Sequence, residues 1–277
     1  MEENKRILQT ERELRGYMEV MELYALPDKL GFSRDIAEEL GKQSKVAATS
    51  MGIPTLDSLL GGLVPGQLVT LSAPTGEGKT RFLQSLTFHF AESGVPSVWF
   101  SYEVTGREFF DRFGGQIPDF YLPRQMIDSN VSWLIERIAE GVAKFDARVI
   151  FIDHLHFLLS MKELAEARSI SLAIGDLMRR LKRAAIKYNV VIFLVSHLTK
   201  IEHEKPPTLN DLRDSSFIAQ ESDVVLVMWR HKQKTRVNEG LTWSHTNEAR
   251  ISVEKNRRLG TKGIVKLLFD GVRFKEI

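Results

Sequence analysis

The chain contains no cysteine among its 277 residues. This absence excludes disulfide bonds and thiolate metal sites, and it fits a protein of a reducing compartment. The sequence also lacks an apolar run of membrane-spanning length, which needs about 20 residues. Its opening, MEENKRILQT, has no apolar signal segment. We therefore expect a cytoplasmic protein with no membrane partner.

Net charge is also small, because 38 Lys and Arg residues nearly balance 36 Asp and Glu residues. A formal charge of +2 does not by itself predict nucleic-acid binding, so any contact with DNA must come from local clusters. The hydrophobic content of 43% and the chain length suit one large α/β domain with a small appendage.

From Met51 onward, near-continuous apolar runs alternate with helix-like segments. Such runs are typical of parallel strands that are buried on both faces. The sequence therefore predicts an α/β fold with a mostly parallel sheet flanked by helices, followed by short antiparallel strands after residue 250. The expected parallel strands are 68–72, 97–102, 149–152, 190–195 and 224–229, the clearest helix is 169–188, and turns are expected at Gly260, Gly263 and Gly271.

Residues 1–48 are predicted to form a separate helical arm, and residues 49–277 the main domain. Apolar side chains recur at helical spacing at Leu14, Tyr17, Met18, Met21 and Tyr24. Ser33 can cap a second short helix that ends at Leu40, and residues 41–50 are expected to be a linker. An apolar stripe on so short an arm needs a partner surface, either its own domain or a neighbouring subunit.

The segment LSAPTGEGKT contains a phosphate-binding loop made of Ala73, Pro74, Thr75, Gly76, Glu77, Gly78, Lys79 and Thr80. It follows an apolar run and precedes the helix-like segment 81–93. This strand–loop–helix context makes the short pattern a specific indication of a phosphate-binding loop. The glycines let successive N–H groups face phosphates, Lys79 supplies positive charge, and the Thr80 hydroxyl is placed for Mg²⁺. Ala73 stands where the usual pattern has a glycine. We expect a nucleoside triphosphate and Mg²⁺ as cofactors.

Two carboxylates end other apolar runs, Asp153 in VIFID and Glu103 in VWFSYE. Ligands of doubly wound sheets bind at the carboxyl ends of the strands. Asp153 therefore fits a residue that orients hydrated Mg²⁺, and Glu103 fits the general base that activates water.

Three histidines lie near the ends of these runs. His197, in LVSHL, either contacts the γ-phosphate or is an ordinary histidine at a strand end, and its position alone favours the second interpretation. His154 and His156 alternate as strand neighbours do, but the sequence suggests no further ligand nearby, so we do not predict a metal site there.

With these residues in place, residues 51–277 resemble the RecA-type ATPase domain of DnaB-like hexameric replicative helicases. MGIPTLDSLLGGLVPGQL resembles the entry to the family's P-loop, FSYE its FSLE segment, and VIFIDHLHFL its second acidic motif. The resemblance makes Glu103 the catalytic base and His197 the γ-phosphate sensor. Because phage and mitochondrial primase-helicases commonly have histidine at that position, His197 and the pair Asp153-His154 lean towards their branch.

Two later segments make the resemblance more specific. PPTLNDLRDSSFIAQESDVVLVMWR resembles the family's DNA channel loop, which implies that Arg213, Asp214 and Ser216 hold single-stranded DNA. EKNRRLGTKG resembles the segment whose two cations reach the γ-phosphate of the neighbouring subunit, which implies this role for Lys255 and Arg257.

The resemblance implies an ATP-dependent DNA helicase for DNA replication that assembles as a homo-oligomeric ring, with six subunits in this family, and moves 5′ to 3′ on one strand. Residues 1–48 are too short for the family's collar domain or for a primase domain, so a primase or loader would be a separate partner. Two alternatives stay open: a RecA- or KaiC-like ATPase that does not unwind DNA, and a helicase-derived loader module.

Overall fold

The computed structural model describes residues 31–42, 47–126, 130–159, 169–198, 206–208, 211, 215–237 and 240–277. Residues Ala47–Ile277 form one compact unit. Ahead of it, helix α2 (Ser33–Lys42) has no buried residue and runs two residues beyond the expected end. The predicted apolar stripe from Leu14 to Tyr24 lies outside the described residues. None of the described helices is long and apolar enough to cross a membrane.

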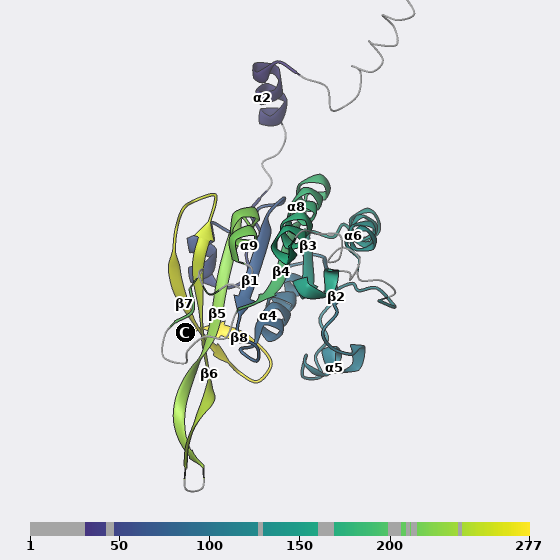
Figure 1. Cartoon of the computed structure of the whole chain (residues 1–277). Helices are drawn as coiled ribbons and strands as arrows, with labels where there is room; N and C mark the ends of the chain where they lie inside the picture. Colours follow the sequence, from purple (N-terminus) through teal and green to yellow (C-terminus); the bar gives the residue numbers. More distant parts are fainter. Residues whose placement is uncertain are drawn as a thin grey trace, which may run out of the picture. The chain divides into compact units, whose positions relative to one another are not determined.

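The main unit is built on one eight-stranded sheet with the order β2-β3-β4-β1-β5-β6-β7-β8 (Figure 1). The first five strands in this order pair in parallel, and the last three join in antiparallel fashion. This arrangement confirms the predicted fold class. The strands are β1 (Leu68–Ala73), β2 (Ser97–Ser101), β3 (Val149–Asp153), β4 (Val191–His197), β5 (Val224–Val237), β6 (Gly240–Asn256), β7 (Gly263–Phe269) and β8 (Phe274–Glu276).

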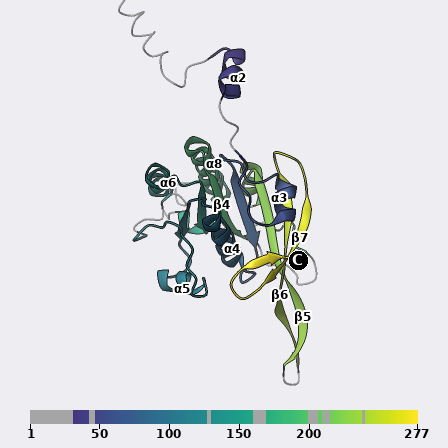
Figure 2. The same cartoon turned by 180° about the vertical axis from the view of Figure 1, so that it is seen from behind.

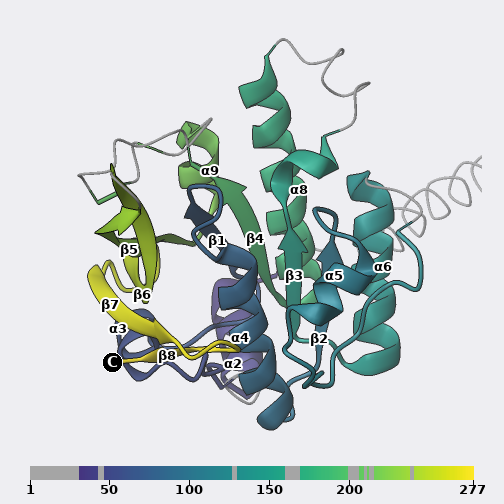
Figure 3. The same ribbon diagram turned by 90° about the horizontal axis from the view of Figure 1, so that it is seen from below.

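Helices cover both faces of the parallel strands (Figures 2 and 3). Alternate residues of one strand enter different cores: Phe151 belongs to one hydrophobic cluster and Ile152 to the other. This division explains why the strands read as continuous apolar runs. The first core includes residues of α3 (Pro54–Leu60), α4 (Lys79–Glu92) and α5 (Gly106–Asp111), and the second includes residues of α6 (Val131–Phe145), α8 (Ile170–Tyr188) and α9 (Ser215–Glu221).

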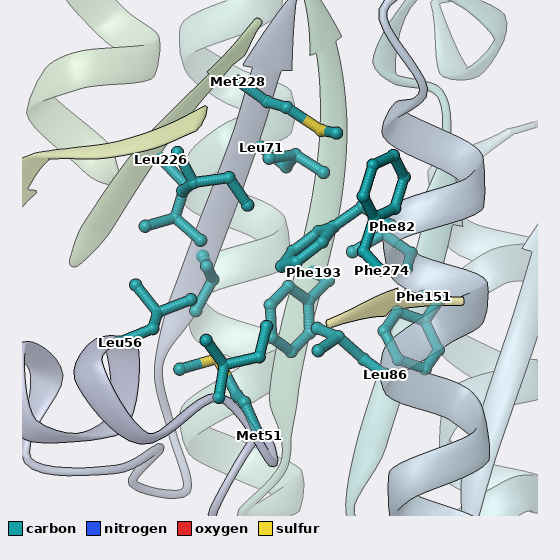
Figure 4. Close-up of a cluster of buried hydrophobic side chains, with 14 of the residues drawn as sticks. Met51, Leu56, Leu71, Phe82, Leu86, Phe151, Phe193, Leu226, Met228 and Phe274 are labelled. Atoms are coloured by element: carbon teal, nitrogen blue, oxygen red, sulfur yellow. The ribbon is translucent and has the colours of Figure 1, made fainter. Parts of the chain in front are cut away.

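The first core packs aromatic rings between α4 and the sheet (Figure 4). Phe82 of α4 lies 6.5 Å from Phe274 of β8 between ring centroids, and Phe151 lies 5.3 Å from Phe193. These side chains are at most 6% exposed. Phe90 of α4 also lies 6.1 Å from Phe151 between ring centroids, so α4, and with it the phosphate-binding loop, is attached to both β3 and β8.

The C-terminal third departs from the expectation in two places. Strand β5 does not end at Trp229 but continues to Val237, and it pairs with β6 as far as Val237–Gly240. In Figure 1 this hairpin extends beyond the other strands. Gly263 is the first residue of β7 and pairs with Val253, so the expected turn there is wrong, whereas Gly260 and Gly271 have positive φ outside the strands.

Candidate active site

The phosphate-binding loop connects β1 to α4. Gly76 and Gly78 have φ of 83° and 99°, in the left-handed region that favours glycine. A Cβ atom at Gly78 would also lie 3.4 Å from the ring of Phe274. Among the described residues, no side chain caps the N-terminus of α4. Its first N–H groups can therefore bind an anion, as expected for a phosphate site.

Lys79 is the first residue of α4 and is 6% exposed. Its Nζ donates to the carbonyl oxygens of Ala73 (3.0 Å) and Pro74 (3.1 Å) and lies 3.2 Å from Nδ1 of His197. Burial lowers the pKa of Lys79, while the charges of Asp153 and Glu103 oppose that shift. The lysine is thus held in the loop by groups that phosphate oxygens could replace.

Ala73 is the last residue of β1 and is fully buried. It contributes its carbonyl oxygen to Lys79, and its methyl group belongs to the first core. The alanine therefore fits where the usual motif has a glycine.

The side chains of Thr80, at the start of α4, and Asp153, at the end of β3, are in contact. The Thr80 hydroxyl donates to Oδ2 of Asp153 at 2.6 Å, and no described residue donates to the buried Oδ1. Burial raises the pKa of Asp153 to about 6, and the nearby charge of Glu103 adds to this effect. A hydroxyl beside a buried carboxylate with an unused oxygen fits the oxygen ligands that Mg²⁺ prefers.

Glu103, Asp153 and His197 come together because β2, β3 and β4 are neighbours. In the pairing register Ser101 faces Asp153 across β2 and β3, and Ala73 faces His197 across β1 and β4. Glu103 lies two residues beyond the end of β2 and is exposed. The carboxyl ends of the parallel strands therefore place the predicted base, the predicted Mg²⁺ residue and the predicted sensor at one edge.

His154 joins this group, and His156 lies further out, with its ring centroid 5.6 Å from that of His154 and 6.2 Å from that of His197. The ring of His154 lies 4.3 Å from that of His197 at 85°, and ligand atoms of Glu103, His154 and His197 all lie within 4.8 Å of one another. Burial, followed by the charge of His197, lowers the pKa of His154 to about 4. Strand β3 ends at Asp153, and His156 lies in the 3-10 helix η1 (Leu155–Leu158), so the two histidines are not strand neighbours.

Glu77 makes contacts that the sequence did not predict. Its carboxylate accepts the backbone N–H of Arg230 at 2.7 Å, and lies 3.0 Å from Nζ of Lys232 and 3.2 Å from Nε2 of His245. Burial by itself would raise its pKa, but these contacts outweigh burial and lower it. One end of the phosphate-binding loop is thereby attached to the β5–β6 hairpin. In the sequence, the polar residues that follow Trp229 are the one feature that could have indicated this contact.

Lys255 and Arg257, the two predicted cations, differ in their surroundings. Lys255 donates to the carbonyl oxygens of Ala219, Gln220 and Ser222, at and just after the end of α9. The Arg257 side chain is 60% exposed and lies 3.6 Å from Asp223. Arg257 is therefore the more accessible of the two.

The predicted DNA loop is described only in part. Arg213 and Asp214 lie outside the described residues. Ser216 belongs to α9 (Ser215–Glu221), so it lies in a helix rather than in the expected loop. Ahead of it, the Asp211 carboxylate accepts the N–H and the hydroxyl of Thr208.

The sequence profile of the DnaB-like helicase C terminal domain matches residues 121–276, more than half of the chain. The chain belongs to this family. The matched part contains Asp153, His197, Lys255 and Arg257, while the phosphate-binding loop and Glu103 precede it.

Individual proteins agree with this assignment. The chain is 27% identical over 264 residues to the replicative DNA helicase DnaB of Mycoplasma genitalium, which covers 81% of this chain and 55% of that protein. It is 28% identical over 149 residues to the DNA repair protein RadA of Campylobacter jejuni, covering 52% of this chain and 32% of RadA. The chain spans 55–62% of the length of the first three replicative-helicase relatives.

Two solved structures share the fold. One, the structure of an ATPase domain, superimposes with a TM-score of 0.70 at 19% identity, covering 88% of this chain and 96% of that one. A DnaB-like replicative helicase, studied with its interactions with primase, gives a TM-score of 0.69 at 19% identity, covering 99% and 76%. The RecA-like DnaB ATPase fold expected from the sequence is confirmed.

Proposed function

We propose that this protein is an ATP-driven DNA helicase that acts in DNA replication. One observation carries the proposal. In a chain of the DnaB-like family, Lys79, Thr80, Asp153 and Glu103 converge at the carboxyl ends of adjacent parallel strands. This convergence supplies the positioning and charge neutralisation that phosphoryl transfer requires.

In the proposed reaction, Lys79 exchanges the carbonyls of Ala73 and Pro74 for phosphate oxygens of ATP. The exchange is favourable because an ammonium binds a charged oxygen more strongly than a neutral carbonyl. Glu103 then holds the attacking water and accepts its proton. Its exposed position beyond β2 leaves room for that water.

Thr80 and Asp153 would hold Mg²⁺, which neutralises charge on the phosphates when it is bound. The Asp153 carboxylate supports this role, because its Oδ1 accepts no hydrogen bond from a described residue. His197 would contact the γ-phosphate once Lys79 turns from Nδ1 towards the nucleotide.

We propose that Arg257 completes the site of a neighbouring subunit in a homo-oligomeric ring, six-membered as in the family. Its guanidinium is exposed and held by one long contact to Asp223, so little is lost when it turns away. Lys255, proposed as the second cation, would first have to leave three carbonyl oxygens. The arrangement favours Arg257 as the principal cation that reaches the neighbouring subunit's γ-phosphate, and Lys255 as the residue that holds the end of α9 in place.

For DNA we propose contact through Arg213, Asp214 and Ser216, with movement 5′ to 3′ along one strand. The family and the DLRDSS segment support this assignment.

Membership of the phage and mitochondrial branch stays a prediction that rests on His197 and His154. A cytoplasmic location and a separate primase partner are part of the same proposal, the latter supported by the primase-associated structural neighbour.

One alternative is a RecA- or KaiC-like ATPase that acts on DNA without unwinding it, and the similarity to a DNA repair protein fits a role on DNA other than replication. A helicase-derived loader is the second alternative. The purified chain should be assayed for ATPase activity with and without single-stranded DNA, and for displacement of one strand from a forked duplex. DNA-stimulated hydrolysis with displacement supports the helicase. Hydrolysis without displacement, in an assembly shown to be a ring on DNA, supports the RecA-like alternative, and no hydrolysis supports the loader.

A further inference from the structure

We propose that Glu103, His154 and His197 form a binding site for a divalent transition-metal ion, zinc by its ligand chemistry, and that the bound ion blocks ATP hydrolysis. One ligand atom from each residue already lies within 4.8 Å of the other two. The three residues come from the carboxyl ends of three adjacent strands, β2, β3 and β4. This site is distinct from the oxygen site of Thr80 and Asp153.

The donor set selects the metal. Two imidazoles and one carboxylate suit zinc and its neighbours, whereas Mg²⁺ requires oxygen ligands and keeps its water. Ligand atoms around a tetrahedral zinc lie roughly 3.4 Å apart, given bonds of about 2.0–2.2 Å. Separations of at most 4.8 Å therefore need to shorten by no more than about 1.4 Å, and the exposed Glu103 side chain can rotate towards the two histidines. Three protein ligands leave the fourth position open to water.

The hydrogen bond between Lys79 and His197 is the main competitor for the metal. Nδ1 of His197 accepts from the lysine, so the neutral ring carries its proton on Nε2. A metal on Nε2 would shift that proton to Nδ1 and end the hydrogen bond. Lys79 would still donate to the carbonyl oxygens of Ala73 and Pro74, so it would not be left unpaired.

The consequence for the reaction follows from Glu103. A carboxylate bound to zinc is a much weaker base, because the positive ion favours its charged form, and it is held at the metal instead of at the attacking water. His197, held by the same ion, cannot turn to the γ-phosphate. The metal and the hydrolytic reaction are therefore mutually exclusive, and zinc should inhibit turnover. This inhibition rests on the proposed function, but metal binding itself does not.

The test uses the full chain without a histidine tag, after removal of metal with a chelator. Zinc affinity is measured by competition with a fluorescent zinc chelator, and the ligands are identified by X-ray absorption spectroscopy. We expect one zinc per chain with histidine and carboxylate ligands. His154→Asn should weaken binding at least about tenfold, since it removes a direct ligand. The neighbouring control is His156→Asn. The His156 ring lies 6.2 Å from that of His197 and is not among the three residues whose ligand atoms come within 4.8 Å of one another, so this variant should bind zinc as the wild type does.

Glu103→Gln is a second variant that changes a metal ligand. It should fold as the wild type does, because the Glu103 side chain is exposed. It should weaken zinc binding as well, and excess Mg²⁺ should leave the zinc affinity unchanged. In ATPase assays with Mg²⁺ present, the concentration of zinc that halves turnover should rise at least about tenfold in His154→Asn, relative to each protein's own rate without zinc. If hydrolysis is absent from the wild type, the proposed function fails while the binding measurements still decide the metal site.

Four results would overturn the site. The wild type binds no zinc, His154→Asn and Glu103→Gln bind it normally, His156→Asn loses as much affinity as His154→Asn, or Mg²⁺ displaces zinc. The last result would place the ion on Thr80 and Asp153 instead.

Discussion

Glu77→Gln removes the negative charge that attaches the phosphate-binding loop to the β5–β6 hairpin. The side chain is 3% exposed and has three partners: the N–H of Arg230 and the side chains of Lys232 and His245. Glutamine keeps the shape and one acceptor for the backbone N–H. It loses the charge that pairs with Lys232.

The size of the effect can be worked from these contacts. Hydrogen bonds to charged groups contribute about 1.5–3 kcal/mol, and leaving one member of a buried ion pair unpaired costs about 3–5 kcal/mol. Lys232 is 21% exposed, so water replaces part of the lost interaction. We therefore expect the free energy of unfolding to fall by about 1–2 kcal/mol for Glu77→Gln and about 2–4 kcal/mol for Glu77→Ala.

The pH dependence has a defined sign. The pKa of folded Glu77 lies below its ordinary value of 4.5. A depressed pKa contributes stability above the unfolded value and loses it as pH falls through the folded value. The difference between wild type and Glu77→Gln should thus be complete at neutral pH and shrink below about pH 4.5.

Urea unfolding at one fixed protein concentration measures the stability, and titration with a fluorescent nucleotide measures affinity. If about 0.7–1.4 kcal/mol of the lost stabilisation comes from the nucleotide-binding conformation of the loop, the Kd for nucleotide should rise three- to tenfold. A double-mutant cycle with Lys232→Met should give a coupling of roughly 1 kcal/mol. Glu136→Gln is the matched control, because Glu136 is 69% exposed with one contact of 3.9 Å. Equal stability and equal affinity in Glu77→Gln and wild type, or no coupling, would refute the reasoning.

Three further predictions concern hydrolysis and DNA. Lys79→Ala should abolish nucleotide binding, whereas Glu103→Gln should bind nucleotide and not hydrolyse it; normal turnover by Glu103→Gln would remove Glu103 from the base role. Arg257→Ala should lower turnover by about 10³-fold or more with binding intact, and mixing it with Lys79→Ala subunits should recover activity. No recovery in assemblies shown to be mixed would place the whole site in one chain. Arg213→Ala should weaken single-strand binding and lower its salt slope by roughly one phosphate's worth, and an unchanged slope would remove this loop from the DNA contact.

The parallel strands could be predicted from the sequence because each is covered on both faces. Phe151 and Ile152 enter separate cores, so consecutive residues of the strand are both buried and the strand sequences are mostly apolar. The hairpin could not be predicted in the same way. Beyond Trp229 the segment RHKQKTRV is polar, and its strand conformation comes from pairing with β6. That pairing is a property of two segments together, which no single-segment pattern records.

Glu77 shows the same limit at the level of one side chain. The phosphate-binding pattern defines which backbone groups face a nucleotide, and for that purpose position 77 can be any residue. Its partners Lys232 and His245 are more than 150 positions away in the chain. They reach Glu77 because β5 lies beside β1, and a pattern within ten residues contains no information on strand order.

The histidines show where a sequence argument could have gone further. His154 and His156 alternate in the sequence, but they are not strand neighbours because the chain leaves the strand after Asp153. The rule that placed Glu103, Asp153 and His197 at one edge applies equally to a residue directly after a strand. Once β3 and β4 are taken as neighbours, His154 has to lie near His197, and the observed ring separation of 4.3 Å follows. The missing knowledge was therefore the strand order, since the residue types and their places at strand ends were already readable.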